Sequence, residues 1–254
     1  MNSICPLLLV MVAVAISALS AFAAEPEWPA ARGVAAPEDF FPILPWGPAG
    51  VDDIAGIAEC NFTVAGFVQP AALPECEKHG LRAIIYNPPD PDCEPWKAKW
   101  RDVSDEAIDA AIKTVIERAG ESPAILGYYI NDEPGTPSFP GLARAVANVK
   151  KWAPGKLAYI NLFPGYATLG APDTSQLGAA SFTEYLDRFA EEVRPQMLSY
   201  DDYQVLYSDD FADSARAAIY FSDLLLTREA AMRHDLPFWN TVASNQIRPF
   251  TVIP

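Results

Sequence analysis

Acidic residues stand at the ends of two apolar, β-rich runs of this 254-residue sequence. One run ends in Asp132 and Glu133, and the other ends in Asp201 and Asp202. Adjacent carboxyl groups at the end of an apolar strand repel each other and lose part of their hydration, and both effects raise a carboxyl pKa. A carboxyl group that keeps its proton near neutral pH can act as a general acid. We therefore predict Glu133 as a general acid and Asp201 as a second catalytic carboxylate.

The alternation of side chains along a strand predicts which neighbours share a face with Glu133. In a regular strand, Tyr129 and Asn131 point to the same side as Glu133, and Asp132 points to the opposite side. A structural role is the alternative for the two acids, since either could cap a helix or form a salt bridge in a loop.

The second acidic strand end, Leu198 to Tyr203, is expected to follow the same alternation. Ser199, Asp201 and Tyr203 then share one face, and Tyr200 and Asp202 share the other. A buried aspartate is costly unless it is paired or solvated. We therefore place Asp201 and Tyr203 at the mouth of a site, whereas Asp202 could simply cap the following segment.

Aromatic rings and side-chain amides recur at the ends of the other apolar runs. Sugar C–H bonds stack on aromatic faces, and sugar hydroxyls find donors and acceptors on amides and acids. This combination indicates carbohydrate binding, although each residue taken alone also fits a core or surface position. The residues that we predict to bind substrate are Trp46, Tyr86, Asn131, Asp132, Asn161, Tyr203 and Trp239.

Seven apolar runs alternate with helical patterns, which predicts a parallel sheet with helices packed outside it. No glycine-rich nucleotide-binding motif follows any run, so we predict an α/β fold of the (β/α)8 TIM-barrel type rather than an open sheet. Active sites of such barrels form at the carboxyl ends of the strands, where the acids stand. The predicted strands are Phe40–Trp46, Phe62–Val68, Leu81–Asn87, Ala124–Asp132, Lys156–Phe163, Met197–Tyr203 and Pro237–Ser244.

Capping signals place helices between these strands. Ser104 is expected to cap a helix that ends at Gly120. Ser181 and Glu184 form a predicted capping box, and the helix that it opens stops before Pro195. A longer helix is expected over roughly residues 210–233.

The N-terminal residues 4–24 carry no charge and end in small side chains. They predict a signal peptide over residues 1–23, with an uncleaved membrane anchor as the alternative. Residues 24–254 are expected to form a single barrel domain that is truncated before its eighth strand. We expect a monomer that is secreted or periplasmic and that has no membrane contact after signal cleavage.

The composition argues against several classes of partner. Lys and Arg number 18 and Asp and Glu number 33, so the net charge of −15 would repel nucleic acid. The sequence has two histidines, and the cysteine spacing fits no zinc site. We therefore predict no cofactor and no metal, and we take carbohydrate as the expected partner.

The motif Tyr-x-x-x-Asp-Glu-Pro at residues 128–134, within this order of strands, resembles the (β/α)8-barrel glycoside hydrolases of clan A. That clan includes β-galactosidases and cellulases, and the resemblance extends loosely from Phe40 onward. In the clan, Asn-Glu-Pro at the end of strand four carries the acid/base glutamate. Glu133 matches that glutamate, and Asp132 replaces the usual asparagine. The clan's nucleophile is a glutamate at the end of strand seven, but residues 238–244 contain no acid.

The residues and the resemblance together predict a secreted glycoside hydrolase-like protein that uses carboxylate acid/base catalysis. Asp201 would act as nucleophile if it lies ~5 Å from Glu133, or as a base for water at ~6.5 to 9.5 Å. A non-catalytic carbohydrate-binding barrel is one alternative, because the strand-seven acid is missing. A metal-dependent hydrolase is another, with Mg²⁺ or Ca²⁺ bound by Asp132, Glu133, Asp201 and Asp202.

Overall fold

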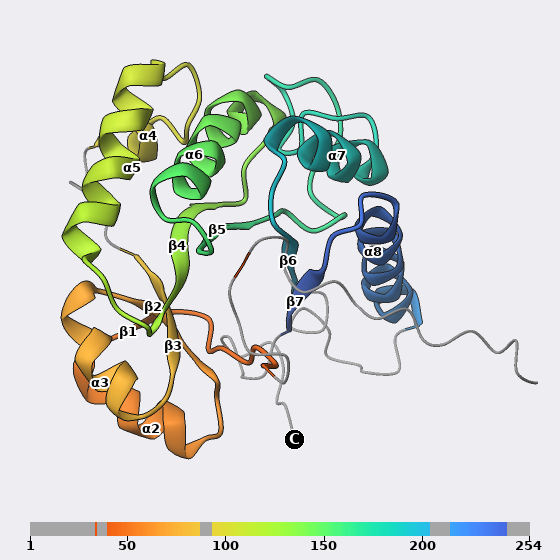
Figure 1. The fold of residues 1–254 in the computed structure, drawn as a ribbon. Helices are drawn as coiled ribbons and strands as arrows, with labels where there is room; N and C mark the ends of the chain where they lie inside the picture. The colour runs from red at the N-terminus through yellow and green to blue at the C-terminus, as the bar shows by residue number, and fades with distance from the viewer. Residues whose placement is uncertain (1–33, 35–39, 87–92, 204–213, 243–254) are drawn as a thin grey trace, which may run out of the picture.

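The computed structural model describes residues 34, 40–86, 93–203 and 214–242. Seven strands follow one another in chain order, and the helices stand around the outside of them (Figure 1). Every strand pair is parallel, so the carboxyl ends of neighbouring strands lie at the same edge. The strands are β1 (Pro48–Ala49), β2 (Val64–Val68), β3 (Arg82–Ile85), β4 (Ile125–Asp132), β5 (Leu157–Asn161), β6 (Leu198–Asp202) and β7 (Phe238–Val242).

The strands form a five-stranded sheet, β1 to β5, and a two-stranded sheet of β6 and β7. An isolated parallel bridge between Leu162 and Tyr200 continues the order from β5 to β6. The N–H of Leu162 also donates to the carbonyl of Ser199 at 2.7 Å. Within the described ranges no ladder pairs β7 with β1, so the fold is a parallel α/β sheet whose closure into a barrel is not shown.

The helices vary from short turns to a helix of 20 residues. In the part of the chain that the structure describes, none is both long and apolar enough to cross a membrane. The helices are α2 (Ile54–Glu59), α3 (Leu73–Lys78), α4 (Glu94–Lys97), α5 (Asp105–Ala119), α6 (Phe139–Trp152), α7 (Phe182–Arg188) and α8 (Ser214–Arg233).

The predicted helix caps are confirmed with one change. Ser104 Oγ accepts from the N–H of Ala107 at 3.2 Å, and Gly120 follows the end of α5 in a positive-φ conformation. At α7, Ser181 Oγ accepts from the N–H of Glu184 at 3.0 Å, but the Glu184 carboxylate accepts from Ala180 rather than closing the box on Ser181. The signal peptide and residues 210–213 of the predicted last helix lie outside the described residues.

The predicted first strand, residues 40–46, is wrong. The segment contains Pro42 and Pro45, which lack an N–H and therefore cannot donate to a ladder. It contacts the start of β2 through irregular hydrogen bonds instead, with Ile43 N–H donating to Thr63 Oγ1 at 2.8 Å. The strand that pairs with β2 is the two-residue β1, which lies just after this segment.

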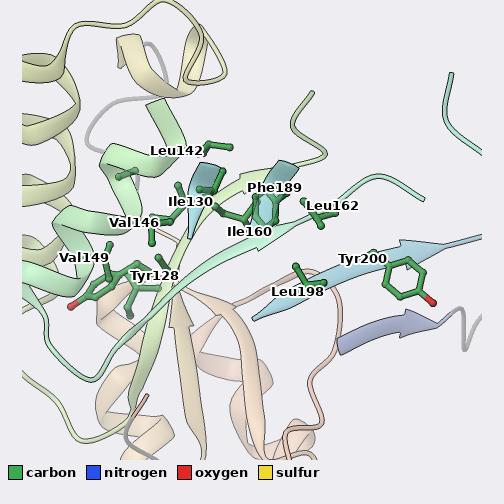
Figure 2. Packing of buried hydrophobic residues seen from close by; sticks show 14 of the residues in the cluster. Tyr128, Ile130, Leu142, Val146, Val149, Ile160, Leu162, Phe189, Leu198 and Tyr200 are labelled. Carbon is green, nitrogen blue, oxygen red and sulfur yellow. The ribbon is translucent and has the colours of Figure 1, made fainter. Parts of the chain in front are cut away.

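Apolar side chains fill both faces of the sheet. The outer core lies between the strands and the helices, and Figure 2 shows Leu142, Val146 and Val149 of α6 packed near Tyr128 and Ile130 of β4. A second, inner cluster lies on the opposite face of the strands. Its buried members are Val64, Phe67, Ile84, Leu126, Leu157, Tyr159 and Met197.

A β-bulge near the end of β4 changes which residues share a face. Tyr129 pairs with Tyr159, but Asp132 pairs with Asn161, so the register shifts by one residue between these two pairs. The extra residue breaks the regular alternation. The bulge therefore removes the basis for the prediction that Asn131 points with Tyr129 into the site, because it brings Asp132 level with Asn161 instead.

Candidate active site

The predicted acids meet at the carboxyl ends of β4, β5 and β6. Asn161 at the end of β5 donates from Nδ2 to Asp132 Oδ1 at 3.1 Å and to Asp201 Oδ2 at 2.9 Å. Glu133 directly follows β4, and its N–H donates to the carbonyl of Asn161 at 2.8 Å. Its left-handed backbone, with φ of 46°, turns the chain at this point. We refer to Asp132, Glu133 and Asp201 as the acid cluster.

Asn161 holds two members of the acid cluster in place. The residue is fully buried, at 0% exposure, and its Oδ1 accepts from Ser199 Oγ at 3.2 Å. Ser199 in turn lies 2.9 Å from the hydroxyl of Tyr159. Both amide hydrogens of Asn161 therefore point at carboxylates, and the geometry fits an orienting role better than the predicted contact with substrate.

Asp201 is buried but keeps one oxygen available. Tyr203 donates its hydroxyl to Asp201 Oδ2 at 3.0 Å, as their shared face predicts. The side chain is 2% exposed, and Oδ1 has no hydrogen-bond partner among the residues that the structure describes. An oriented carboxylate with one unpartnered oxygen can accept a proton or approach a carbon centre.

The surroundings raise the pKa values of the acid cluster. Burial and the charges of Asp201 and Asp132 raise the pKa of Glu133 to about 7, although Lys99 partly opposes this rise. Burial raises the pKa of Asp201 to about 6, and the hydrogen bonds from Tyr203 and Asn161 limit the rise. Desolvation also raises the pKa of Asp132, even though its side chain lies at the exposed edge of the cluster. Perturbed carboxyls that gather at one place are typical of functional sites.

A strained segment brings a positive charge to the acid cluster. Lys99, Trp100 and Asp102 have φ values of 50°, 63° and 52°, which non-glycine residues seldom adopt. The indole Nε1 of Trp100 donates to the carbonyl of Ile130 at 3.2 Å, next to the bulge of β4. Lys99 lies close enough to oppose the rise in the pKa values of Glu133 and Asp132. No pattern in the sequence predicts this role of Lys99, because strain and proximity are properties of the folded chain.

A row of aromatic rings lies beside the acids on the inner face of the sheet. Ring centroids are 4.7 Å apart between Phe67 and Tyr129 and 6.0 Å apart between Tyr129 and Tyr159. The predicted residues Trp46, Tyr86 and Trp239 each contact a member of this row at 5.1 to 6.0 Å. We refer to the six as the aromatic row: Trp46, Phe67, Tyr86, Tyr129, Tyr159 and Trp239.

Two of the three terminal members of the aromatic row are open to solvent. Trp46 is 38% exposed and Tyr86 is 37% exposed, whereas Tyr159 is buried. Exposed rings at the rim can stack on a sugar, while the buried rings fill the inner core. The sequence analysis did not predict that Phe67, Tyr129 and Tyr159 form one group. Their positions on the inward faces of the strands could have indicated it.

Asn131 is not brought to the acid cluster. It pairs with Ile160, whose side chain belongs to the outer core, and it is buried at 9% exposure. Its Nδ2 has no hydrogen-bond partner within the described part of the chain. The bulge thus removes the alternation on which the predicted role of Asn131 in substrate binding rests.

The described residues contain no group of three or more His, Cys, Asp or Glu side chains that is placed to hold a metal ion. The acid cluster is tied by Asn161 and Tyr203, which supply hydrogen bonds where a cation would supply charge. The geometry therefore gives no support to the hypothesis of a metal-dependent hydrolase.

No protein-family model and no curated protein matches this sequence. Among solved structures, a β-glucuronidase from Ruminococcus gnavus in complex with D-glucaro-d-lactam is similar at a TM-score of 0.53 and 9% identity, over 82% of this chain and 36% of that one. This likeness supports the assignment of an α/β fold with parallel strands.

Two further structures are similar at lower scores. One is a plant β-glucan endohydrolase, with a TM-score of 0.43 and 12% identity over 65% of this chain and 56% of that one. The other is a putative α-L-fucosidase from Bacteroides thetaiotaomicron, with a TM-score of 0.42 and 14% identity over 66% of this chain and 52% of that one. This chain spans between 36% and 56% of the length of these three structures.

Proposed function

We propose that this protein is a glycoside hydrolase in which Glu133 and Asp201 cleave a glycosidic bond by acid/base catalysis. The observation that carries this proposal is that the two acids stand at the carboxyl ends of neighbouring strands in different surroundings, because Asn161 and Tyr203 donate to Asp201 and favour its ionised form. Within the described part of the chain no such donor contacts the Glu133 carboxyl, and burial and the charges of Asp201 and Asp132 raise its pKa, which favours its protonated form. A pair of carboxyls divided in this way can supply an acid and a base at the same pH.

In the proposed reaction, Glu133 gives its proton to the glycosidic oxygen as the bond between that oxygen and the anomeric carbon breaks. Asp201 either attacks the anomeric carbon or removes a proton from the water that does so. Asn161 and Tyr203 hold Asp201 by hydrogen bonds that favour its ionised form. The exposed members of the aromatic row, Trp46 and Tyr86, stack on the sugar. The fold similarity to a glucuronidase is compatible with this chemistry.

The role of Glu133 can be tested with aryl glycosides that differ in the acidity of their leaving group. Glu133→Gln removes the proton donor, so hydrolysis of glycosides with poor leaving groups should fall by about 10²- to 10⁴-fold. Glycosides with strongly acidic leaving groups need little protonation and should lose much less. Glu59→Gln, an exposed substitution at the end of α2, is the matched control and should leave all rates unchanged.

Two results would count against this assignment. Equal losses for all leaving groups would mean that Glu133 does not protonate the departing oxygen. Wild-type rates in the Glu133→Gln variant would remove Glu133 from the mechanism altogether.

The role of Asp201 can be tested separately by Asp201→Asn and by the configuration of the product. If Asp201 is the nucleophile, the first product of the wild-type enzyme keeps the anomeric configuration, and azide should restore glycosyl transfer to the variant. If Asp201 is the base, the configuration inverts and azide gives the inverted glycosyl azide. A variant with wild-type kcat would exclude Asp201 from both roles.

A non-catalytic carbohydrate-binding protein is the second candidate, and the composition of β7 favours it. The strand reads Phe238 to Val242 without an acid. In this case, sugars bind to the aromatic row and no product is released. Glycan binding without turnover across a panel of aryl glycosides would favour this candidate, and turnover that depends on Glu133 would exclude it.

A further inference from the structure

A second pair of acids is buried on the outer face of β6, away from the acid cluster. Asp202 on β6 is 1% exposed and Asp223 on α8 is 5% exposed. A side-chain hydrogen bond joins the two carboxyl groups, and Asp223 Oδ2 also accepts from the N–H of Gly165 at 2.9 Å. An ionised carboxyl has no hydrogen to donate, so a hydrogen bond between two carboxyls requires that one of them is protonated. The pair therefore holds one proton.

The packing around the pair is tight and brings three segments together. The helix α8 lies alongside β6 and β7 in Figure 1. A Cβ at Gly165 would overlap the Asp223 side chain, so the loop after β5 approaches this carboxyl as closely as it does only because residue 165 is glycine. The pair thus joins the end of β6, the loop after β5 and the middle of α8.

Among the residues that the structure describes, the titratable groups that face the pair are hydroxyls. They are Tyr200 on β6 and Tyr220 on α8, and burial raises the pKa of both phenols. Tyr220 accepts a hydrogen bond from Asn240 Nδ2 of β7 at 2.9 Å. These groups remain neutral at physiological pH and do not balance a second negative charge.

The basic groups at the far end of α8 have another partner. Arg233 and His234 both contact Asp187 of α7, at 2.7 Å and 2.9 Å. The pair also lacks a third acid, histidine or cysteine that would complete a metal site within the described ranges. A shared proton is therefore the charge that makes burial of the two acids tolerable.

We propose that Asp202 and Asp223 share a single proton that fastens α8 to the carboxyl end of β6, so that the helix detaches more readily as the pH rises. Burial and the Asp202 charge raise the pKa of Asp223 to about 7. When α8 detaches, Asp223 returns to water and to an ordinary pKa near ~4, and the shared proton is released. Detachment is therefore favoured roughly tenfold per pH unit between these values, and the effect levels off above about pH 7.

This proposal does not depend on the reaction assigned to the acid cluster, because its measurement is local protection of backbone amides. Hydrogen exchange of the full chain, followed by mass spectrometry from about pH 5 to about pH 8, reports on α8 and α5 in the same sample. After correction for intrinsic exchange rates, protection of α8 should fall by roughly tenfold per pH unit up to about pH 7. Protection of α5 reports on unfolding of the whole chain, which also releases the protons of Glu133 and Asp201, and it is recorded to separate that process from the detachment of α8.

The variant Asp223→Asn keeps a neutral hydrogen-bond donor beside Asp202 but cannot titrate. Protection of α8 in this variant should lose its steep dependence on pH. Asp202→Asn makes the same change from the strand side and should give the same result, so it replaces the first variant if that one does not fold. The control Asp187→Asn alters the other acid that binds α8 and should retain the wild-type dependence.

The proposal is overturned if protection of α8 in the wild-type protein does not fall as the pH rises to about 7. It is also overturned if Asp223→Asn or Asp202→Asn retains the steep dependence of the wild-type α8. Loss of the dependence in Asp187→Asn would assign the effect to the contact between α7 and α8 instead.

Discussion

At the scale of single residues, the carboxyl group of Asp201 is subject to two opposing influences on its pKa. Its Oδ2 accepts from Asn161 and Tyr203, which orient the group and favour its ionised form. Burial acts in the opposite direction, and the pKa of Asp201 settles at about 6. Because the hydrogen bonds and the burial act on the pKa of Asp201 in opposite directions, changing either one should alter the pH dependence of the proposed activity.

Tyr203→Phe should move the acidic limb of the pH–rate profile to higher pH. The lost hydrogen bond stabilises the ionised form of Asp201, so its removal raises the pKa of Asp201 and protonates the group over a wider range. We expect a shift of about one pH unit, measured as kcat/KM against pH. The rate above pH 7 should change little. A uniform loss at every pH would indicate that Tyr203 contacts the substrate instead.

Lys99→Met should move the alkaline limb in the same direction. The ammonium group of Lys99 favours the ionised form of Glu133, so its removal raises the pKa of Glu133 and keeps the acid protonated to higher pH. Since Lys99 is exposed and screened by salt, we expect at most about half a pH unit. Lys113→Met on α5 is the control, because Lys113 faces Glu117 far from the acids. A fall of the alkaline limb toward lower pH would contradict this account.

The sequence was sufficient to place Glu133 and Asp201 at the ends of strands, because acids that follow apolar runs are a local pattern. It was not sufficient to assign Asn161, whose amide could equally face a substrate or two carboxylates. Lys99 was missed for a different reason. Its effect on Glu133 depends on a left-handed backbone that no propensity of Lys99, Trp100 or Asp102 favours.

At the scale of elements, the segment from Lys99 to Asp102 is supported by α6. Gly141 lies in the first turn of this helix, and a Cβ there would overlap the carbonyl oxygen of Trp100. The close approach lets Trp100 pack against the sheet and donate to Ile130. The strain in the segment is thus compensated by contacts on two sides.

Gly141→Ala should therefore destabilise the protein and displace the segment. The added methyl group overlaps a backbone atom that has no rotamer to escape into, so we expect a loss of ~1 to 3 kcal/mol in the free energy of unfolding. The control is Gly56→Ala in α2, where nothing lies within 4 Å of the added Cβ. Urea unfolding of both variants measures the difference, and equal stability of the two would refute the predicted clash.

Local signals in the sequence located the starts of α5 and α7, because their serine caps act within three residues. Six of the seven predicted strands were also found in place. The helix α6 was missed, since Ser138 makes no side-chain cap at its start. The bulge in β4 was missed because its cause is the pairing with β5, which lies outside the strand itself.

At the scale of the whole molecule, several buried acids with raised pKa values determine how stability responds to pH. Glu133, Asp201 and Asp223 have pKa values of about 7, about 6 and about 7 in the folded protein. Unfolding returns each of them to about 4, so the folded state binds more protons between these values. The free energy of unfolding should therefore fall as the pH rises from about 4.5 to about 7.

This dependence can be measured by urea unfolding at intervals across that range. Asp109 acts in the opposite sense at lower pH, because its hydrogen bonds from Arg144 and Asn148 lower its pKa to about 2. Its contribution is lost only as the pH falls below about 4. We thus expect a stability maximum between about pH 4 and about pH 5. An increase in stability from pH 5 to pH 7 would contradict the assigned shifts.

The placement of the side chains in the motif Asp132-Glu133-Pro134 depends on the bulge in β4 that precedes it. The bulge adds one residue to β4. Every residue after it therefore lies on the opposite face of the strand from the one that regular alternation would give it. Deleting either Ile130 or Asn131 would leave Asp132, Glu133 and Pro134 adjacent and unchanged in the sequence. The same deletion would turn Asp132 away from Asn161. The motif would then remain in the sequence, but the hydrogen bond from Asn161 to Asp132 would be lost.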